Sequence, residues 1–579
     1  MHSIGRVSSI SYNKLVFEVS DFSKLNYNLL GHTYVAKGVV DYVTIINDIN
    51  QKFIYQVIKA EDKEQILTKL ENSKLDYTGK FECIPIGIIQ DGKIEFNMKQ
   101  YPSLQNRVYL TNEDEYGIIF SIDHSEHALR LGVIEEKYTA EIDPEKIFSH
   151  HTAILGNTGS GKSTTIRQLI SETKKLETKN LHLHVLDIHD EYSGIDNVST
   201  IDVLKEYKIN VESLDLQDWI NLVKPSDLVQ LPVLQTALKL ADALNNFRIS
   251  EKWLRCFLAF TLFRYAQTDA VAKRTKIINI LTGTGIDTSS YNAQYANFSS
   301  SDEKKFLDSL LATMRFEHSD ETDNTFLQKR LEESDYRVDS FESLLNGLEF
   351  SFLLEECKGN AQARSHCGSL EMRIKSIQTR YSSLLSDKTN STLISDEQVI
   401  VYSVSSLDDD LLLFFSSYLL KQIFESNKKL PLNDRDIHIF ILEEAHRYIA
   451  RFRENSSFQE IERFKTIARE GRKFGCFIFL SSQRPSELSS TVLSQCNNYL
   501  IHRIKNNLDL DYMLKTIPYI NSNQLTRISY LPTGTAFIVG ELFPIPVEVK
   551  VHEVSNNDVS TTPKIKYKEL NDSDWKVKK

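Results

Sequence analysis

One eight-residue stretch, Gly156–Ser163, constrains the fold of this chain more than any other feature. It reads GNTGSGKS and fits the phosphate-binding pattern GxxxxGK[ST] at every fixed position. An apolar run at 152–155 precedes it, and a helix-like segment at 164–170 follows it. Phosphate binding needs this order, because a strand then delivers successive backbone N–H groups to a helix N-terminus, whose dipole attracts negative charge. With 21 glycines in 579 residues, chance is a poor explanation, and the sequence predicts a nucleotide-binding α/β unit.

The residues of this loop have separate expected roles. Lys162 is predicted to reach the β- and γ-phosphates of ATP, and the Ser163 hydroxyl is predicted to bind Mg²⁺. ATP and Mg²⁺ are therefore the expected cofactors. The predicted nucleotide ligands are the loop residues and the one that follows: Gly156, Asn157, Thr158, Gly159, Ser160, Gly161, Lys162, Ser163 and Thr164.

Composition places this motif in an ordinary globular protein. Hydrophobic residues make up 41% and charged residues 25% of the 579, a length that holds about three or four domains. No apolar run approaches the ~18–20 residues of a membrane span, and the first residues lack the apolar core of a secretory signal. The six cysteines are scattered without a CxxC pair, which argues against a zinc site and a disulfide framework. We therefore expect a cytoplasmic protein with no membrane partner.

The charge of the chain limits how it can meet nucleic acid. A net charge of −11 argues against a protein that coats nucleic acid over its whole surface. It is compatible with a basic channel inside a ring-shaped assembly, where positive charge is hidden in a pore.

The hydrophobic pattern divides the chain into segments. Short β-rich runs recur up to about residue 140, which is typical of a small barrel or sandwich. An α/β rhythm follows, a long stretch with helical spacing interrupts it, and the rhythm resumes near residue 399. The pattern predicts an N-terminal β-barrel at 1–140, an α/β core at 141–200 and 396–540, an α-helical insertion at 201–395, and a C-terminal strand and tail at 541–579.

Two glutamates follow another apolar run. The run at 437–442 is predicted to be a buried strand, and Glu443 and Glu444 come directly after it. In open α/β sheets, ligands lie outside the carboxyl ends of the strands. We expect Glu443 to hold Mg²⁺ through water, and Glu444 to orient and deprotonate the attacking water. A solvated acidic pair is the alternative, and the phosphate loop in the same unit favours catalysis.

Two further groups of polar residues lie near the end of the predicted core. Gln483 follows a buried strand at 476–480, where an amide can sense the γ-phosphate; an ordinary strand-end amide is the alternative. Arg469 and Arg472 lie three residues apart and share one side of a predicted helix end. An arginine on the γ-phosphate accelerates phosphoryl transfer, and a neighbouring subunit often supplies it. Two arginines on a surface helix are otherwise simply solvated.

Taken together, these residues resemble the HerA family of hexameric DNA translocases, in the FtsK–HerA branch of RecA-like motors. The matching stretches occur in the family's order and lie at 150–163, 185–194, 439–449 and 468–504. The resemblance covers about 141–200 and 395–550. It implies a RecA-like P-loop core with a small N-terminal β-barrel and an α-helical insertion.

The resemblance also implies roles for individual residues. It places ATP at subunit interfaces of a six-membered ring and makes Arg469 or Arg472 an arginine finger that acts on the neighbouring subunit. Asp187 and Glu191 fall on the family's acidic motif near the nucleotide, and Arg503 is a candidate for a phosphate contact. Glu443 departs from the general pattern, which has Asp at this position, so its magnesium geometry is expected to differ.

The segment after the glutamates is the local candidate for contact with DNA in a central pore. It mixes basic and aromatic residues, which suits tracking of a nucleic acid backbone. An amphipathic helix with ordinary surface arginines is the alternative. The residues are His446, Arg447, Tyr448, Arg451, Phe452 and Arg453.

The resemblance implies an ATP-hydrolysing DNA translocase or helicase that works as a homohexamer with a partner nuclease or a sirtuin-like NAD-consuming effector. We favour a role in anti-phage defence, because the chain carries no nuclease motif of its own and HerA-like motors are often paired with separate effectors there. DNA end processing in double-strand break repair is the alternative setting. From a different class, an ATP-regulated ring scaffold would activate an effector without translocating DNA.

Overall fold

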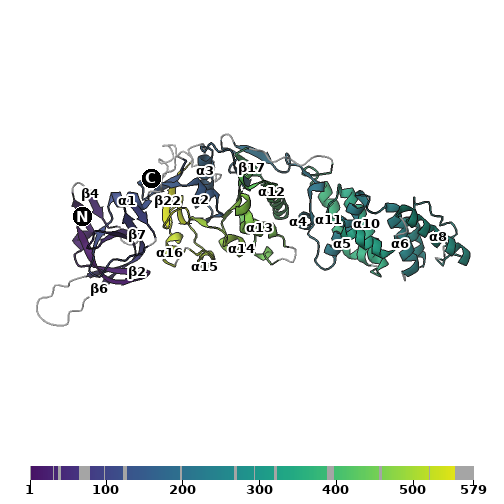
Figure 1. The fold of residues 1–579 in the computed structure, drawn as a ribbon, viewed down its shortest axis with the longest axis horizontal. Coiled ribbons are helices and arrows are strands. Elements are labelled where there is room, and N and C mark those ends of the chain that lie inside the picture. Colours follow the sequence, from purple (N-terminus) through teal and green to yellow (C-terminus); the bar gives the residue numbers. More distant parts are fainter. Residues whose placement is uncertain are drawn as a thin grey trace, which may run out of the picture.

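The computed structural model describes residues 2–29, 32–36, 41–63, 78–96, 98–120, 127–195, 198–265, 270–292, 294–295, 297–318, 322–360, 362–387, 397–455, 459–518, 520 and 522–553. The molecule is elongated, with a β-barrel at one end, a twisted sheet in the middle and a helical insertion at the other end (Figure 1). None of the helices in these ranges has both the length and the apolar character that crossing a membrane requires. The predicted tail beyond residue 553 lies outside these ranges.

Six antiparallel strands near the N-terminus close into a barrel. Their order is β2-β1-β9-β5-β6-β7, and β7 pairs back with β2. Apolar side chains such as Val7, Phe17 and Phe53 alternate along the strands and fill the interior. The elements of this region are β1 (Ser3–Ser11), β2 (Lys14–Val19), β3 (Asn26–Leu29), β4 (His32–Val35), β5 (Tyr42–Ile46), β6 (Lys52–Lys63), β7 (Thr78–Gln90), β8 (Lys93–Glu95), β9 (Arg107–Leu110) and α1 (Glu113–Phe120).

An eleven-stranded sheet forms the middle of the molecule. Its strands from β20 to β14 run parallel, and the four on the other side of β20 extend it in antiparallel pairs. In order across the sheet, they are β11 (Tyr138–Ile142), β10 (Leu129–Ile134), β22 (Val547–Val551), β21 (Thr535–Gly540), β20 (Asn498–Ile501), β12 (Thr152–Leu155), β19 (Cys476–Ser482), β18 (Ile437–Leu442), β13 (Leu181–Asp187), β17 (Val399–Ser403) and β14 (Ser199–Asp202).

The central strands match the apolar runs of the sequence. The strands predicted at 152–155 and 437–442 are β12 and β18, with the same bounds. All seven residues of β13 are buried, as expected for a parallel strand that is covered on both faces. The predicted α/β fold class is therefore confirmed.

Two strands in the region predicted as barrel belong to the large sheet instead. β10 and β11 form a hairpin, and β10 pairs with β22, so that Ile134 lies opposite Val549. Apolar side chains at Leu129 and Leu131 join the core beneath the sheet. Alternation along a strand shows that one face is buried, but not which sheet the strand joins.

The helical insertion leaves the sheet after β14 and returns at β17. Two short strands, β15 (Ile209–Asn210) and β16 (Leu385–Ser386), pair where the chain departs and comes back. Its outer part has an apolar core of its own around Trp253, Phe257 and Phe326. The helices are α4 (Leu216–Val223), α5 (Gln230–Asn245), α6 (Glu251–Tyr265), α7 (Ala270–Leu281), α8 (Ser300–Glu317), α9 (Asn324–Glu332), α10 (Phe341–Cys357) and α11 (Ala363–Arg380).

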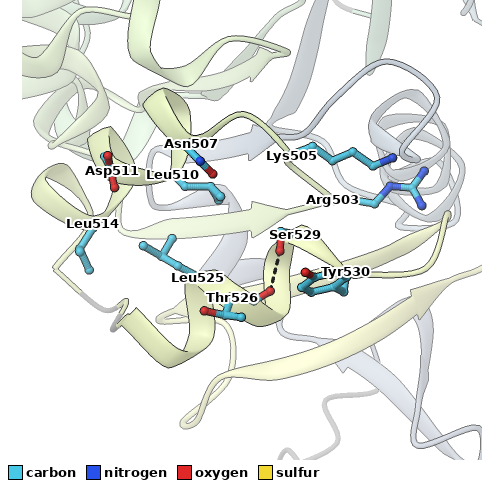
Figure 2. A pocket seen from close by; sticks show the side chains of 10 residues that line it. All are labelled: Arg503, Lys505, Asn507, Leu510, Asp511, Leu514, Leu525, Thr526, Ser529 and Tyr530. Atoms are coloured by element: carbon cyan, nitrogen blue, oxygen red, sulfur yellow. Dashed lines mark hydrogen bonds between the residues drawn. The ribbon is translucent and has the colours of Figure 1, made fainter.

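Seven helices accompany the sheet itself. Two of them, α15 and α16, follow β20 along the chain and lie beside each other (Figure 2). The seven are α2 (Pro144–Phe148), α3 (Lys162–Thr173), α12 (Asp409–Lys429), α13 (Glu462–Glu470), α14 (Ser490–Leu493), α15 (Asn507–Thr516) and α16 (Ser522–Ser529).

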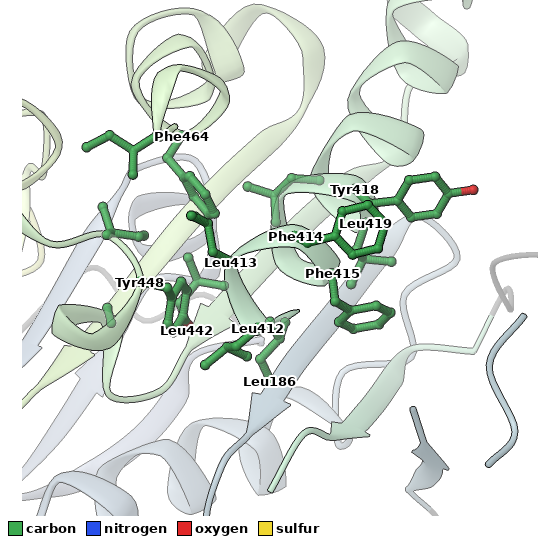
Figure 3. Packing of buried hydrophobic residues seen from close by; sticks show 14 of the residues in the cluster. Leu186, Leu412, Leu413, Phe414, Phe415, Tyr418, Leu419, Leu442, Tyr448 and Phe464 are labelled. Atoms are coloured by element: carbon green, nitrogen blue, oxygen red, sulfur yellow. The ribbon is translucent and has the colours of Figure 1, made fainter. Parts of the chain in front are cut away.

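Helix α12 shows how the sequence builds this core. Asp408 caps its N-terminus by accepting a hydrogen bond from the backbone N–H of Leu411, and two lysines at its C-terminal end complement the helix dipole. Its apolar residues, including Leu412 and Phe415, are fully buried and join the same cluster as Leu186 and Leu442 of the sheet (Figure 3). This packing fixes the strands that end at the candidate site.

Replacing Leu412 with alanine should leave a cavity between α12 and the sheet. Because the side chain is fully buried, we expect a loss of about 2–5 kcal/mol in the free energy of unfolding. A lower thermal unfolding midpoint in scanning calorimetry would report this loss. Leu432→Ala is the matched control, since Leu432 is 73% exposed and its truncation should leave the midpoint unchanged. Equal midpoints for the two variants would contradict this account of the core.

Candidate functional site

The phosphate-binding loop lies where three parallel strands end side by side. β12 runs between β19 and β20, so the loop after β12 can bond to both neighbours. The backbone N–H of Gly156 donates to the carbonyl oxygen of Ser482 at 3.2 Å, and that of Asn157 donates to the carbonyl oxygen of Arg503 at 3.0 Å. The first two residues of the loop are thus fixed from opposite sides.

Two glycines of the motif are required by close approach as well as by conformation. At Gly156 an added Cβ would lie 2.6 Å from the Cβ of His502, and at Gly161, where φ is 120°, it would lie 3.0 Å from the Cα of Gly534. Side chains at these positions would push the loop away from the strand ends and would also strain its backbone. The glycine pattern therefore reflects both turn geometry and packing.

Lys162 is the loop residue that the sequence predicts to reach the β- and γ-phosphates. Its Nζ donates to the carbonyl oxygens of Gly156 at 2.8 Å and Asn157 at 3.4 Å, which curls the side chain over the loop. Burial lowers the pKa of this amine, and the nearby carboxylates of Glu444 and Glu443 oppose that shift. The arrangement holds a positive charge at the N-terminus of α3, where a phosphate chain would find it.

His502 belongs to this site and has no sequence motif. It is fully buried, its Nε2 lies 2.9 Å from the Oγ1 of Thr165, and its Nδ1 lies 3.1 Å from the carbonyl oxygen of Thr535. Because a carbonyl can only accept, Nδ1 carries the proton and Thr165 donates to Nε2. Burial, with a contribution from Lys162, lowers the pKa of His502 to about 4. A neutral imidazole thus links α3 to β21.

Glu443 is held by two protein donors. Its Oε2 accepts a hydrogen bond from the backbone N–H of Ile188 at 3.0 Å, and its Oε1 accepts one from the Tyr192 hydroxyl at 3.1 Å. Burial, together with the charge of Asp187, raises the pKa of Glu443 to about 8. A cation near this carboxylate would lower the pKa and favour the ionised form. The site therefore suits Mg²⁺.

Glu444 lies in a chain of polar contacts that runs to the phosphate loop. The amide nitrogen of Gln483 donates to Oε1 of Glu444, and the hydroxyl of Thr158 donates to the amide oxygen of Gln483. Glu444 is buried and adopts a left-handed backbone conformation with φ 43° and ψ 44°, which costs a non-glycine residue about 1 kcal/mol or more. The structure thus joins Thr158, Gln483 and Glu444, which lie far apart in the sequence.

Asp187 organises a turn. Its Oδ2 accepts from the backbone N–H of Tyr192 at 2.9 Å, and its Oδ1 accepts from those of Glu191 at 3.1 Å and His189 at 3.3 Å. The side chain is fully buried, and burial raises its pKa. Both oxygens are therefore used to shape the segment that carries Tyr192 and Ile188, the partners of Glu443. Glu191 lies on this turn, and its carbonyl oxygen accepts a hydrogen bond from Arg167.

The two arginines proposed as fingers lie at the amino ends of the parallel strands, opposite the phosphate loop. Arg469 is near the end of α13 and pairs with Glu462 at 2.6 Å, and Arg472 is exposed in the following turn, η6 (Gly471–Phe474). Both precede β19, whereas Gln483 follows it. The seven residues of β19 separate the two ends by roughly 20 Å at ~3.3 Å per residue. Neither arginine therefore reaches the phosphate loop of its own chain.

The segment proposed for DNA contact is only partly available for it. It forms two short 3₁₀ turns, η4 (Ala445–Arg447) and η5 (Arg451–Arg453), rather than an amphipathic helix. Tyr448 is fully buried and donates to the carbonyl oxygen of Glu443, so its ring does not face solvent.

Charge pairing also limits this segment. Arg453 is buried and pairs with Glu460 and Asp410, while Arg447 pairs with Asp409. We therefore withdraw Tyr448 and Arg453 as DNA contacts, and we retain Arg451 and the 79% exposed Phe452. Burial of individual side chains cannot be read from a mixed basic and aromatic segment.

The residues of the site fit a nucleotide phosphate chain with Mg²⁺. Ser160, within the loop, has a buried hydroxyl without a hydrogen-bond partner among the described residues. Ser163 is the second residue of α3, at the positive end of the helix dipole. Two buried carboxylates, Glu443 and Glu444, lie across from them. Oxygen donors of this kind are those that Mg²⁺ prefers.

Comparison with known proteins shows what this chain is similar to. A family model described as "Helicase HerA, central domain" matches residues 129–332. The chain is 24% identical to the DNA double-strand break repair helicase HerA of Pyrococcus furiosus, over 77% of this chain and 72% of that protein. It is 26% identical to the probable DNA double-strand break repair helicase HerA of Methanocaldococcus jannaschii, over 86% of this chain and 90% of that protein. VirB4 of Thermoanaerobacter pseudethanolicus aligns over 75% of this chain and 98% of that one, with 13% identity and a TM-score of 0.42.

Replacing Asp187 with alanine should destabilise the protein, because three backbone N–H groups lose their acceptor. We expect the free energy of unfolding to fall by about 2–4 kcal/mol, measured by thermal or urea unfolding. The exposed Asp434 serves as a matched control, and Asp434→Ala should unfold like the parent. If Asp187→Ala kept the parent stability and lost only nucleotide binding, Asp187 would be a nucleotide ligand and not an organiser of the turn.

Proposed function

We propose that this chain, which is similar to HerA-family helicase ATPases, forms a homohexameric ring that hydrolyses ATP with Mg²⁺ and uses the energy to move DNA through a central pore. The ring works with a separate effector protein, a nuclease or a sirtuin-like NAD-consuming enzyme. We propose anti-phage defence as its setting and a cytoplasmic location.

One observation carries this proposal. The phosphate loop, Glu444 and Gln483 gather at the carboxyl edge of the parallel sheet, while Arg469 and Arg472 lie at its amino edge. A site that needs an arginine on the γ-phosphate is then incomplete in one chain and is completed by a neighbour that presents its other edge. Repeating this head-to-tail contact closes a ring.

The residues of the site divide the work of hydrolysis. When bound, ATP with Mg²⁺ supplies the phosphoryl group that water attacks. Lys162 would offset the charge of the phosphates, Ser163 would offer a hydroxyl oxygen to Mg²⁺, and Glu443 would hold the metal through water, because two protein donors already hold its carboxylate. Glu444 orients the attacking water and accepts its proton.

Gln483 couples this chemistry to the loop. Its amide bridges Thr158 and Glu444, so a γ-phosphate that bonds to Thr158 or to Gln483 changes the position of the catalytic carboxylate. Arg451 and Phe452, on the segment after the glutamates, are the proposed contacts to the DNA backbone. ATP hydrolysis would then move the DNA-contacting segment, which is covalently continuous with Glu444.

Glu444→Gln separates the motor from a scaffold. The amide keeps the shape of the side chain but cannot accept the proton of water, so we expect ATP binding to survive and hydrolysis to fall by at least about 100-fold. Nucleotide binding by calorimetry and phosphate release by a coupled assay measure the two steps. Glu371→Gln is the control, because Glu371 lies on α11 in the helical insertion and pairs with the surface Lys375.

The same variant tests the biological proposal in cells that carry the chain and its neighbouring genes. A motor predicts that Glu444→Gln removes protection against phage while Glu371→Gln retains it. Full protection by a variant with no hydrolysis would show that the ring acts as an ATP-regulated scaffold. Unchanged phage sensitivity after deletion of the gene itself would reject the defence role.

Mixed rings test whether the arginines act across the subunit interface. Rings of Lys162→Ala alone, or of the double variant R469A and R472A alone, should lose ATPase activity by about 1,000-fold or more. In a mixture, some interfaces combine an intact phosphate loop with an intact arginine pair from its neighbour. Random assembly of equal amounts therefore restores up to about a quarter of the activity.

The control for this experiment is Arg364→Ala, which removes an exposed arginine that pairs with Glu349 on the helical insertion. Rings of this variant should be fully active, alone or mixed. Inactive mixtures, with ring assembly confirmed by mass measurement, would place both arginines outside the site. Full activity of the double arginine variant by itself would do the same.

A further inference from the structure

The two carboxylate oxygens of Glu444 have different surroundings. Oε1 accepts a hydrogen bond from the side-chain amide of Gln483. Oε2 is buried and accepts no hydrogen bond among the described residues. A buried carboxylate oxygen without a donor is costly, because it has lost its water without a replacement. The groups that lie beside Oε2 therefore decide how the carboxylate is oriented.

His446 lies against this oxygen. Its Nδ1 is 3.3 Å from Oε2 of Glu444 and 3.2 Å from the hydroxyl oxygen of Ser482. The side chain of His446 is only 15% exposed, so most of it lies inside the protein. An ionised carboxylate can only accept hydrogen bonds, so the proton between these two atoms belongs to Nδ1. Hydrogen bonds at catalytic groups are often long before the substrate binds and shorten when it is bound.

The turn after β18 fixes the position of His446. Glu444 has a left-handed backbone, and η4 begins directly after it. The backbone N–H of Arg447 donates to the carbonyl oxygen of Glu444 at 2.9 Å, and the hydroxyl of Tyr448 donates to the carbonyl oxygen of Glu443 at 3.2 Å. The strained residue and the tight turn together bring two side chains, two residues apart, to the same place. The backbone thus holds the imidazole beside the carboxylate.

Ser482 connects His446 to the phosphate loop. Its hydroxyl oxygen accepts a hydrogen bond from the backbone N–H of Arg484 at 3.1 Å, and its carbonyl oxygen accepts one from the N–H of Gly156 at 3.2 Å. Ser482 is the last residue of β19 and is fully buried. One residue therefore contacts both the start of the phosphate loop and the imidazole that lies against Glu444.

The surroundings of His446 favour its neutral form. Burial lowers the pKa of the imidazole, and the nearby Arg484 and Arg447 lower it further, while the carboxylates of Glu444 and Glu487 oppose the shift. The ring is therefore neutral near pH 7. A neutral N–H can orient a carboxylate without the positive charge that would make the carboxylate a weaker base.

We propose that His446 is a positioning residue for Glu444, which donates from Nδ1 to Oε2 while Gln483 holds Oε1. Each carboxylate oxygen has a second lone pair, so one remains for the attacking water. The proposal rests on the proposed role of Glu444 as the base and adds the residue that orients it. His446 acts through Glu444 and contacts neither the nucleotide nor DNA. This replaces its interpretation as a basic residue of the DNA-contacting segment.

Three substitutions separate a donor at Nδ1 from a side chain of the right size. His446→Asn places an amide nitrogen where Nδ1 was, His446→Gln places it further out, near the former Nε2, and His446→Leu has no donor. We expect His446→Gln and His446→Leu to lower kcat for phosphate release about tenfold, the equivalent of one hydrogen bond, and His446→Asn to stay within about threefold of the parent. The KM for ATP, and the Kd for ATPγS by calorimetry, should stay within about twofold for all three.

The outcomes distinguish this inference from the function on which it rests. His366→Leu is the control, because His366 is exposed on α11 and its loss should leave kcat unchanged. A parental kcat in all three His446 variants, or an active His446→Gln beside an inactive His446→Asn, would overturn the positioning role. Parental hydrolysis by Glu444→Gln would instead reject the base itself and the proposed function with it.

Contact with DNA is the other role open to His446, because the residue lines a cavity of about 830 Å³ together with Arg451 and Phe452. Fluorescence anisotropy of a labelled single-stranded oligonucleotide, titrated with full-length protein, measures this contact. The positioning role predicts that His446→Leu binds the oligonucleotide with the parental affinity. Weaker oligonucleotide binding together with a parental kcat would assign His446 to DNA and overturn the proposal.

Discussion

The parallel pairing of β12 with β19 on one side and β20 on the other is the constraint on which the site depends. It brings three strand ends to one place, and the loop after β12 is then fixed by backbone hydrogen bonds to Ser482 and Arg503. This register therefore places the loop between the residues that follow β19 on one side and those that follow β20 on the other. The residues proposed to act on the γ-phosphate follow β18 and β19, and a cavity of about 760 Å³ lies on the other side, after β20. A shift of one residue in either pairing would turn every side chain of that strand to the opposite face.

A second constraint ties the helical insertion to the helix that leads to the arginines. Asp218 of α4 is fully buried and bonds to Lys421 of α12 and to Arg463 of α13, and Asp215 also bonds to Arg463. Removing one partner of such a group would leave a buried charge without its counter-charge, which is strongly destabilising. The insertion therefore holds α13, and with it Arg469, in a fixed position relative to the sheet. That rigidity suits the role proposed for Arg469, which is to meet the phosphates of another subunit.

The fold class and the strand bounds could be predicted from the sequence because buried parallel strands are short apolar runs, as at 181–187 and 437–442. The phosphate loop could be predicted equally well, since its glycines and lysine have fixed spacing. Other features depend on contacts between distant segments. Tyr448 reads as a surface aromatic beside arginines and is buried, and Asp187 shapes a turn through three backbone bonds. One sequence feature points to His502, which is its place directly after a strand that adjoins a glycine-rich loop. That feature is too common to identify a site residue by itself.

The proposed ring follows from the positions of the phosphate loop and the two arginines at opposite ends of the parallel strands. An arginine roughly 20 Å from the phosphate loop of its own chain cannot act on a nucleotide bound there. In the proposed ring, head-to-tail contact would bring it to the phosphate loop of the neighbouring subunit. Hydrolysis in such a ring would depend on the distance between two subunits, and any force that changes this distance would change the rate. Glu444 would lie on the other side of the same interface. Its carboxylate is connected through Gln483 to Thr158 of the loop. In the proposed ring, coupling between ATP and movement would follow from the separation of the loop and the arginines at the two ends of the parallel strands.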